Sequence, residues 1–332
     1  MRVLILQLKR IGDLVLTTPV LTALKALGAR VTLIADGPCS SLLPALPGVD
    51  EGLAYRRKGD NKALWKRIRE HDWDVCLDFT GSDRSAFMGW LSRTPRRITF
   101  QWVCKRFLRR LAYHEFVDSP VRLAHTCDHY LDLLRPLGIT AANPAPSLIV
   151  PVSAQEKAKA ILTDAGISGD YMLLHPGTAR PEKYWLPERW TELIAKLGST
   201  IPPIITTGPD PYELQHVAKI KGAPVVRPPD LLVLAALVEK ARIVVSCDTA
   251  VVHLAAAFSR PQVALYGPTN PFHWRPRHNR AVVISAAQLP DPLTRFLPKM
   301  KGAPTEKIPT EVVTQAVAKA LSLPPSSSAG SS

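Results

Sequence analysis

The sequence lacks the features of several classes of protein. Its five cysteines are odd in number and no two of them form a C-x-x-C pair, so neither a disulfide framework nor a structural zinc site is expected. No apolar run approaches the roughly 18 residues that a membrane-spanning helix needs. The opening segment from Met1 to Gln7 is too short an apolar run for a secretory signal. We therefore expect a cytoplasmic protein that begins with a buried strand.

Acidic side chains are the minority among the charged residues. The chain has 28 of them against 42 lysines and arginines, which gives a net charge of +14. Residues 1–150 hold 22 basic and 14 acidic side chains, and the remainder holds 20 and 14. This excess favours anionic partners, whether nucleotide diphosphates, anionic lipid surfaces or nucleic acid, and charge alone does not choose among them.

Short aliphatic segments alternate with helical patterns twice along the chain, which predicts two parallel α/β sheets. The expected strands are residues 2–8, 31–35 and 74–79, then 171–175, 204–208, 243–247 and, as the last, 263–267. The expected helices follow Asp13 as far as Leu27, then cover 153–165, 190–197, 231–240 and 248–258, with a terminal helix capped by Thr310.

A proline-rich stretch from Asn143 to Pro151 interrupts this alternation and is interpreted as a linker. The predicted domains are therefore residues 1–150 and 151–323, each a doubly wound α/β domain. The tail, residues 324–332, is rich in serine and proline and is expected to be disordered. Two such domains facing each other would line a central cleft with the carboxyl ends of their strands, where open α/β sheets bind ligands.

The first candidate stretch is Lys9-Arg10-Ile11-Gly12-Asp13, which joins the first strand to the first helix. Asp13 either caps that helix or faces a ligand, and the local sequence leaves both open. The stretch has no G-x-G-x-x-G pattern, so ordinary dinucleotide binding is not supported.

Two further candidate stretches follow strands of the second domain. The loop after His175 contains Thr178, Arg180 and Lys183, whose hydroxyl and cations suit a phosphate clamp, while its tryptophans are expected to pack in the core. The next loop contains Asp210, which either accepts hydrogen bonds from ribose hydroxyls or caps a helix.

The fourth stretch runs from Ser246 to Ala257, where a strand ends and a helix of small residues begins. Free backbone N–H groups at such a helix start favour a diphosphate. Asp248 would repel that phosphate unless it faces the sugar or caps the helix. His253 lies on an apolar helix face and is either a core histidine or part of the ligand site.

Together, in this order, these stretches resemble the lipopolysaccharide heptosyltransferases, which are family 9 of the glycosyltransferases and have the GT-B fold of two Rossmann-like domains. The resemblance covers roughly residues 1–280. It is strongest in Arg10-Ile11-Gly12-Asp13 with Thr17-Thr18-Pro19, in Lys183-Tyr184-Trp185-Leu186-Pro187-Glu188-Arg189-Trp190, in Asp248-Thr249 with His253-Leu254-Ala255-Ala256-Ala257, and in Tyr266-Gly267-Pro268-Thr269-Asn270-Pro271.

The resemblance implies an inverting transfer of heptose from ADP-heptose to the inner core of lipopolysaccharide, with no cofactor and no required metal. It makes Asp13 the general base and Lys183 the cation that holds the donor diphosphate. The implied donor-binding residues are Thr178, Arg180, Asp210, Asp248, Thr249 and His253. One departure is Ala250, where family members often have glycine, and its methyl group is expected to alter donor affinity.

The acceptor is expected on the first domain, at Lys9, Arg10 and Gly12 and at Arg93, Arg96 and Arg97. These arginines belong to segment 92–110, which has seven basic and no acidic side chains, with interleaved aromatics. The segment is either a solvated basic helix and loop or a surface for an anionic lipid-linked glycan at the inner membrane, which would make the protein peripheral to that membrane. No motif of a nucleic-acid-binding domain accompanies it, so nucleic acid is not an expected partner.

Two alternatives remain open at this point. One is a related glycosyltransferase with another sugar donor or glycan acceptor. The other is a nucleotide-sugar-binding protein without turnover, for which a carboxylate at Asp13 and a cation at Lys183 would have no evident use.

Overall fold

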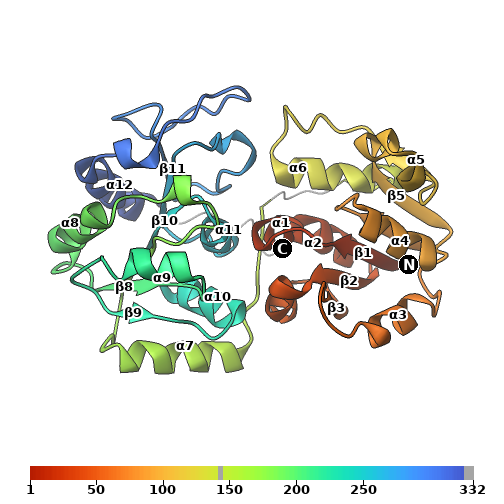
Figure 1. The fold of residues 1–332 in the computed structure, drawn as a ribbon, viewed down its shortest axis with the longest axis horizontal. Helices are drawn as coiled ribbons and strands as arrows, with labels where there is room; N and C mark the ends of the chain where they lie inside the picture. Colours follow the sequence, from red (N-terminus) through yellow and green to blue (C-terminus); the bar gives the residue numbers. More distant parts are fainter. Residues whose placement is uncertain (141–144, 325–332) are drawn as a thin grey trace. The chain divides into compact units, whose positions relative to one another are not determined.

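The computed structural model describes residues 1–140 and 145–324. The start of the predicted linker, at Asn143, and the predicted disordered tail from residue 325 onward lie outside the described residues. The chain divides into two compact units, Met1–Ile149 and Val150–Ser332. Each unit contains a six-stranded sheet in which every pair of neighbouring strands is parallel (Figure 1).

The first unit has the strand order β3-β2-β1-β4-β5-β6. Its strands are β1 (Arg2–Gln7), β2 (Arg30–Asp36), β3 (Glu51–Tyr55), β4 (Val75–Asp78), β5 (Arg96–Phe100) and β6 (Glu115–Val117). Its α-helices are α1 (Ile11–Leu16), α2 (Thr18–Ala26), α3 (Lys62–Ile68), α4 (Asp83–Leu91), α5 (Phe107–Arg110) and α6 (Thr126–Leu131). Its 3-10 helices are η1 (Gly37–Ala45), η2 (Gln101–Lys105) and η3 (Asp132–Leu137).

The second unit repeats this architecture with the strand order β12-β11-β10-β7-β8-β9. Its strands are β7 (Met172–His175), β8 (Pro203–Thr206), β9 (Val225–Val226), β10 (Ile243–Cys247), β11 (Gln262–Tyr266) and β12 (Ala281–Ser285). Its α-helices are α7 (Val152–Asp164), α8 (Pro187–Leu197), α9 (Pro211–Val217), α10 (Leu231–Lys240), α11 (Ala250–Ala257) and α12 (Thr310–Ser322). Its 3-10 helices are η4 (Pro181–Lys183), η5 (Pro271–His273) and η6 (Thr305–Lys307).

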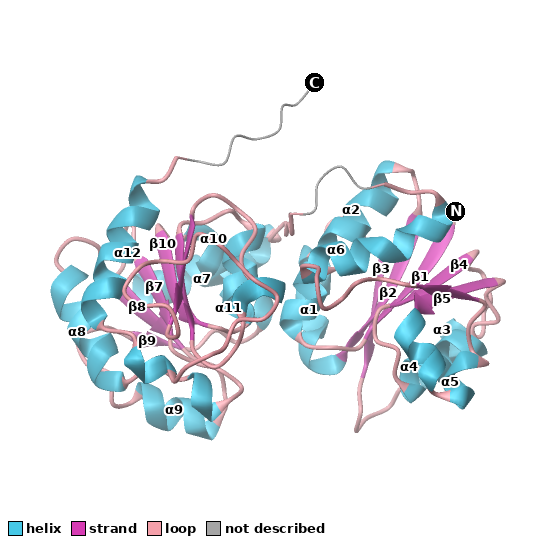
Figure 2. Ribbon diagram, turned by 90° about the horizontal axis from the view of Figure 1, so that it is seen from above, coloured by secondary structure: helices cyan, strands magenta, loops and turns pink. Residues whose placement is uncertain are grey.

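The central strands of both sheets are buried along nearly their whole length, because helices cover both faces of each sheet (Figure 2). This burial explains their continuous aliphatic sequence, since a strand in contact with apolar side chains on both faces has no polar side to present. Trp185 and Trp190 are fully buried in the core of the second unit, with ring centroids 5.0 Å apart, as the sequence predicts.

Each sheet has one point where the order of its strands reverses. In the first unit the chain winds from β1 outward through β2 and β3, and then returns to β4 on the other side of β1. In the second unit β7 and β10 are the corresponding neighbours. The loops that leave the carboxyl ends of these paired strands diverge to opposite faces, which opens the usual ligand-binding position of such sheets.

Several local predictions need correction. The expected first helix is broken at Thr17 into α1 and α2, where the Thr17 hydroxyl donates to the carbonyl oxygen of Asp13 at 2.8 Å. Thr310 is the first residue of α12 and not its N-cap, and its hydroxyl donates to Glu192 at 2.5 Å. The strands β3, β5, β6, β9 and β12 were not predicted, so residues 263–267 are not the last strand. No helix in the described ranges is both long and apolar enough to cross a membrane.

Candidate active site

Asp13 lies at the carboxyl edge of the first sheet, in the first turn of the helix that follows β1. Arg10 is at the N-cap position of α1, so Asp13, the third residue of the helix, does not cap it. Its Oδ1 accepts a hydrogen bond of 2.5 Å from the hydroxyl of Tyr130 in α6. Asp13 is therefore held by a side chain 117 positions later in the chain, which the alternative of a plain helix cap does not explain.

Tyr130 is buried, with 1% of its surface exposed. Burial raises the pKa of its hydroxyl well above the usual range, and the neighbouring charge of Asp13 adds to this. Tyr130 is therefore a neutral donor at any physiological pH, and it fixes Oδ1 of Asp13. Within the described residues, Oδ2 of Asp13 makes no hydrogen bond, so this oxygen is available to take a proton.

Lys9 approaches the same tyrosine. Its Nζ lies 3.4 Å from the Tyr130 hydroxyl oxygen and 5.1 Å from the ring centroid. Burial lowers the pKa of Lys9, and the charges of Asp13 and Asp78 oppose that shift. Lys9 and Asp13 therefore both contact the side chain of Tyr130.

A second carboxylate, Asp78, ends strand β4 next to β1 and was missed by sequence reasoning. It is fully buried, and burial raises its pKa against the opposing effect of its hydrogen-bond donors. Its Oδ1 accepts from the backbone N–H groups of Thr80 and Gly81 at 2.7 and 3.1 Å, and its Oδ2 accepts from the Tyr113 hydroxyl. Thr80 in turn accepts from the N–H of Leu8 at 2.8 Å, so Asp78 ties the loop after β4 to the loop that contains Lys9.

The remaining predicted acceptor residues separate into two groups. Arg10 and Gly12 stay with Asp13, at the N-cap and the second residue of α1. The arginines 93, 96 and 97 lie at the amino end of β5, where Arg96 and Arg97 are level with the first two residues of β4. Since the strands are parallel, this is the opposite edge of the sheet from Asp13.

The side chains of two of these arginines are also occupied within the fold. Arg96 pairs with Glu115 at 2.8 Å, and Arg97 donates to the carbonyl oxygens of Ala112 and Thr94 at 2.6 and 2.7 Å. The structure therefore does not bring them to Asp13, and both alternatives for segment 92–110 omitted the strand β5 that it contains.

In the second unit, Lys183 and Asp248 meet at the carboxyl edge of the sheet. Lys183 ends η4 in the loop after β7, and Asp248 follows β10 directly. The Lys183 Nζ lies 2.6 Å from Asp248 Oδ2, with only 14% and 9% of the two side chains exposed. Because β7 and β10 are the neighbours at which the strand order reverses, the pair lies at the expected ligand position.

The amino end of α11 lies directly after this ion pair. Thr249 is at its N-cap position with extended backbone and no side-chain capping bond. The dipole of an uncapped helix start favours an anion. Lys183 compensates the charge of Asp248 at this helix start.

Known proteins resemble this chain over most of its length. The model of glycosyltransferase family 9 (heptosyltransferase) matches residues 61–297. The chain belongs to glycosyltransferase family 9. A curated relative, lipopolysaccharide heptosyltransferase 3 of Escherichia coli, is 24% identical over 97% of this chain and 98% of its own length.

Solved structures of family 9 share the fold. A family 9 glycosyl transferase from Veillonella parvula superposes with a TM-score of 0.82 at 23% identity, over 96% of this chain and 97% of that one. The E. coli ADP-heptose lps heptosyltransferase II superposes with a TM-score of 0.77 at 20% identity, over 97% and 98%. The family resemblance and the GT-B fold class predicted from the sequence are thus confirmed.

Two of the other predicted donor residues, Asp210 and Arg180, have local partners of their own. Asp210 is the N-cap of α9, and its Oδ1 accepts from the N–H groups of Tyr212 and Glu213 at 3.0 and 3.1 Å. Arg180 forms an exposed 2.5 Å ion pair with Glu182. Thr178 is half-buried in the loop between β7 and η4, and His253 is buried in α11.

Glu213 is a buried carboxylate that sequence reasoning missed in this half of the family 9 fold. It accepts from the Thr207 hydroxyl at 2.9 Å and from the N–H of Gly208 at 2.7 Å. A Cβ at Gly177 would lie 2.2 Å from the Glu213 carboxylate, so that glycine makes room for it. Glutamate at the third helical position after an aspartate cap is the signal that could have pointed to it.

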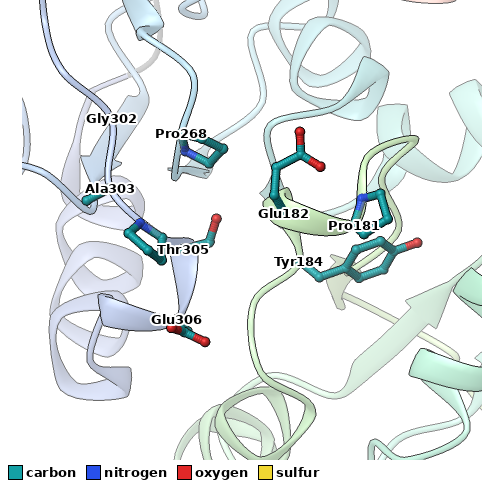
Figure 3. A pocket seen from close by; sticks show the side chains of 9 residues that line it. Pro181, Glu182, Tyr184, Pro268, Gly302, Ala303, Thr305 and Glu306 are labelled. Carbon is teal, nitrogen blue, oxygen red and sulfur yellow. The ribbon is translucent and has the colours of Figure 1, made fainter.

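A pocket of about 380 Å³ lies beside η4. Figure 3 shows Glu182 and Tyr184 on one side of it and Thr305 and Glu306 on the other. Its lining includes two carboxylates and no lysine or arginine, which makes it unsuited to a diphosphate. Lys183 and the start of α11 are not among the residues that line this pocket. The described residues contain no cluster of three or more His, Cys, Asp or Glu side chains that could hold a metal ion.

Proposed function

We propose that this family 9 glycosyltransferase transfers heptose from ADP-heptose to the inner core of lipopolysaccharide, with inversion at the anomeric carbon. The acceptor hydroxyl belongs to Kdo-lipid A or to a core heptose. The observation that carries the proposal is the position of two different chemistries at the strand-order reversals of the two sheets. A carboxylate oriented by a neutral donor is at the first, and a cation beside an uncapped helix start is at the second.

At the first position, Asp13 acts as the general base. The acceptor hydroxyl gives its proton to Oδ2 of Asp13 while its oxygen bonds to the anomeric carbon of the donor. The bond from that carbon to the ADP oxygen breaks on the opposite side, and ADP leaves with the electron pair. A positioned base of this kind contributes about 10²–10⁴-fold to the rate.

At the second position, Lys183 and the N–H groups of α11 stabilise the charge of the leaving diphosphate. An ammonium group has three donors, and Asp248 engages one of them at 2.6 Å. Asp248 therefore fixes the direction of Lys183 and leaves two donors for phosphate oxygens. We propose that these groups do this without a resident metal, and EDTA is expected to leave the rate of transfer unchanged.

The proposed partners follow from this chemistry. They are an ADP-sugar and an anionic lipid-linked glycan acceptor at the cytoplasmic face of the inner membrane, with which the protein associates peripherally. The names of the relatives support this choice, since the E. coli neighbour is an ADP-heptose lps heptosyltransferase. Nucleic acid is not among the partners, since only the net charge of the chain would favour it.

The test is a mass spectrum of Kdo-lipid A acceptors after incubation with ADP-heptose, and with UDP- and GDP-sugars in parallel. A mass gain of one heptose confined to the ADP donor is expected. A gain from another donor would instead support the related transferase. No gain from any donor, together with tight ADP-heptose binding, would support the binding protein without turnover.

A further inference from the structure

Five large apolar side chains are exposed on two neighbouring helices of the first unit. Phe87 and Trp90 of α4 are 50% and 56% exposed, Phe107 and Leu108 of α5 are 72% and 79% exposed, and Leu111 is 61% exposed. The two helices lie side by side in Figure 2 and line one groove. Single exposed apolar residues need no explanation, but a contiguous group marks an interaction surface. We call these five residues the apolar patch.

Four of the five residues of the apolar patch line a groove. Phe87, Trp90, Leu108 and Leu111 line a shared groove of about 370 Å³, together with Asp83, Ala86, Arg109 and Ala112. The rings of Phe87 and Trp90 stack with centroids 5.9 Å apart. The aromatic side chains are therefore supported by one another while their outer surfaces remain exposed.

Exposed basic side chains adjoin the apolar patch along the chain. Residues 105–112 include four arginines and lysines and no acidic residue, and the carboxylate that lines the groove is Asp83. Asp83 is already paired with Arg109 at 2.5 Å. Lys105, Arg106 and Arg110 are exposed next to Phe107 and Leu108 in sequence. We call these three the basic rim.

We propose that the apolar patch and the basic rim form the surface that docks on an anionic lipid bilayer. Aromatic and aliphatic side chains insert at the level of the headgroups, and the flanking cations contact the lipid phosphates, as in interfacial amphipathic segments. Charge complementarity favours this occupant, because the three exposed cations of the basic rim adjoin the apolar patch along the chain, while the Asp83 carboxylate is already paired with Arg109.

The position of the apolar patch connects membrane docking with the proposed transfer to a lipid-linked acceptor. The biological role of the docking surface rests on that proposed function. Arg109 donates to the carbonyl oxygen of Gly81 at 2.8 Å as well as to Asp83, which anchors α5 at the loop after β4. This contact places the Asp83–Arg109 end of the groove at the edge of the sheet that contains Asp13. A bilayer at the patch would therefore present the sugar of a lipid-linked acceptor to the edge with the general base.

The experiment is co-sedimentation of the full chain with vesicles of phosphatidylethanolamine and phosphatidylglycerol, with pure phosphatidylcholine as the uncharged comparison. Leu108→Gln/Leu111→Gln is expected to lower partitioning by about tenfold or more, since the two side chains lose their apolar insertion. The matched control, Leu27→Gln/Leu297→Gln, removes two leucines that are 61% and 42% exposed elsewhere. It is expected to bind as the unaltered chain does.

The basic rim is tested in the same assay. Lys105→Gln/Arg106→Gln/Arg110→Gln is expected to lower binding to the anionic vesicles by about 100-fold, from roughly fivefold for each cation. Binding to phosphatidylcholine should change little. Brominated lipids should quench the tryptophan fluorescence of the protein, and Trp90→Phe should remove much of that quenching.

Unchanged vesicle binding of both multiple variants, or an equal loss in the leucine control, would overturn the proposal. Circular dichroism of each variant separates these results from misfolding. Transfer to a deacylated, water-soluble acceptor is the independent measurement. The patch variants should retain it even when they no longer bind vesicles, whereas failure of the proposed function would abolish it in the unaltered chain as well.

Discussion

The two positions at which the strand order reverses are alike in topology and opposite in electrostatic design. In the first unit, the Asp13 carboxylate is held by the neutral hydroxyl of Tyr130, and the cation Lys9 stays 3.4 Å from that hydroxyl. In the second unit, Lys183 is in direct contact with Asp248 at 2.6 Å. Asp13, the proposed proton acceptor, keeps one carboxylate oxygen without a hydrogen bond among the described residues. Lys183, the proposed phosphate ligand, is instead held in place by the opposite charge of Asp248.

The two sites also differ in what a single substitution should do. Replacing a group at the first site should affect the rate of the chemical step and leave the donor bound. Replacing a group at the second should affect donor binding and also stability, because a largely buried ion pair loses a partner there.

The largest effect is expected from Asp13→Asn. The amide has the shape of the carboxylate and cannot take up the acceptor proton, so turnover at saturating acceptor should fall about 10²–10⁴-fold. Affinity for ADP, measured by calorimetry, should not change, since the donor diphosphate is assigned to the second unit. Near-normal turnover would remove Asp13 from the role of base, and a parallel loss of ADP affinity would break the separation of the two sites.

Lys183→Ala is expected to lower the affinity for ADP about 100-fold and the free energy of unfolding by about 3 kcal/mol, because Asp248 is left without its counter-charge in a largely buried position. The double variant Lys183→Ala/Asp248→Ala separates the two effects. It should recover most of the stability and none of the ADP affinity. Recovery of ADP binding in the double variant would mean that Lys183 serves only to neutralise Asp248.

Acid should destabilise the second unit more than the first. Burial lowers the pKa of His278 to about 4, against 6.5 for an exposed histidine. The stability from keeping His278 neutral is fully present above pH 6.5 and is lost as the pH falls from 6.5 towards 4, by about 2 kcal/mol at pH 5. The buried Asp78 of the first unit has a raised pKa, so protonation there favours the folded form as the pH falls.

Hydrogen exchange at pH 7.5 and pH 5, corrected for intrinsic rates, measures this difference unit by unit. Peptides of the second unit should lose protection at pH 5 and those of the first unit should lose less. His278→Gln has no titrating group and should weaken the pH dependence in the second unit alone. Equal loss of protection in both units would contradict the assignment of the acid sensitivity to His278.

The sequence indicates the positions of Lys183 and Asp248 more directly than the contact between Asp13 and Tyr130, for a physical reason. Lys183 and Asp248 each lie next to a strand that reads as a buried aliphatic run, so their position at the carboxyl edge follows from the strands. Their contact follows from the strand order, which brings β7 beside β10 although 67 residues separate the end of β7 from the start of β10. That order is not visible in a local pattern.

The first site depends on contacts that no local pattern contains. Tyr130 reaches Asp13 across 117 positions, and nothing near Tyr130 in sequence marks it as functional. The prediction for the basic segment 92–110 missed a strand for a different reason. A charge-rich stretch was not expected to contain β5, yet Ile98 to Phe100 are fully buried while Arg96 and Arg97 are held by partners at the start of the strand.

Tyr130→Phe is the most economical test of how the two sites differ. Phenylalanine fills the same buried space and removes only the hydroxyl that holds Oδ1 of Asp13. We expect turnover to fall about tenfold, which corresponds to one hydrogen bond to a charged group, with the KM for ADP-heptose and the affinity for ADP unchanged. Tyr171→Phe is the matched control, because Tyr171 is equally buried and donates to the carbonyl oxygen of Leu237 in the second unit. If both variants lose turnover equally, Tyr130 acts through stability and does not position the base, and the contrast between an oriented carboxylate and a paired cation would have to be drawn from Asp13 alone.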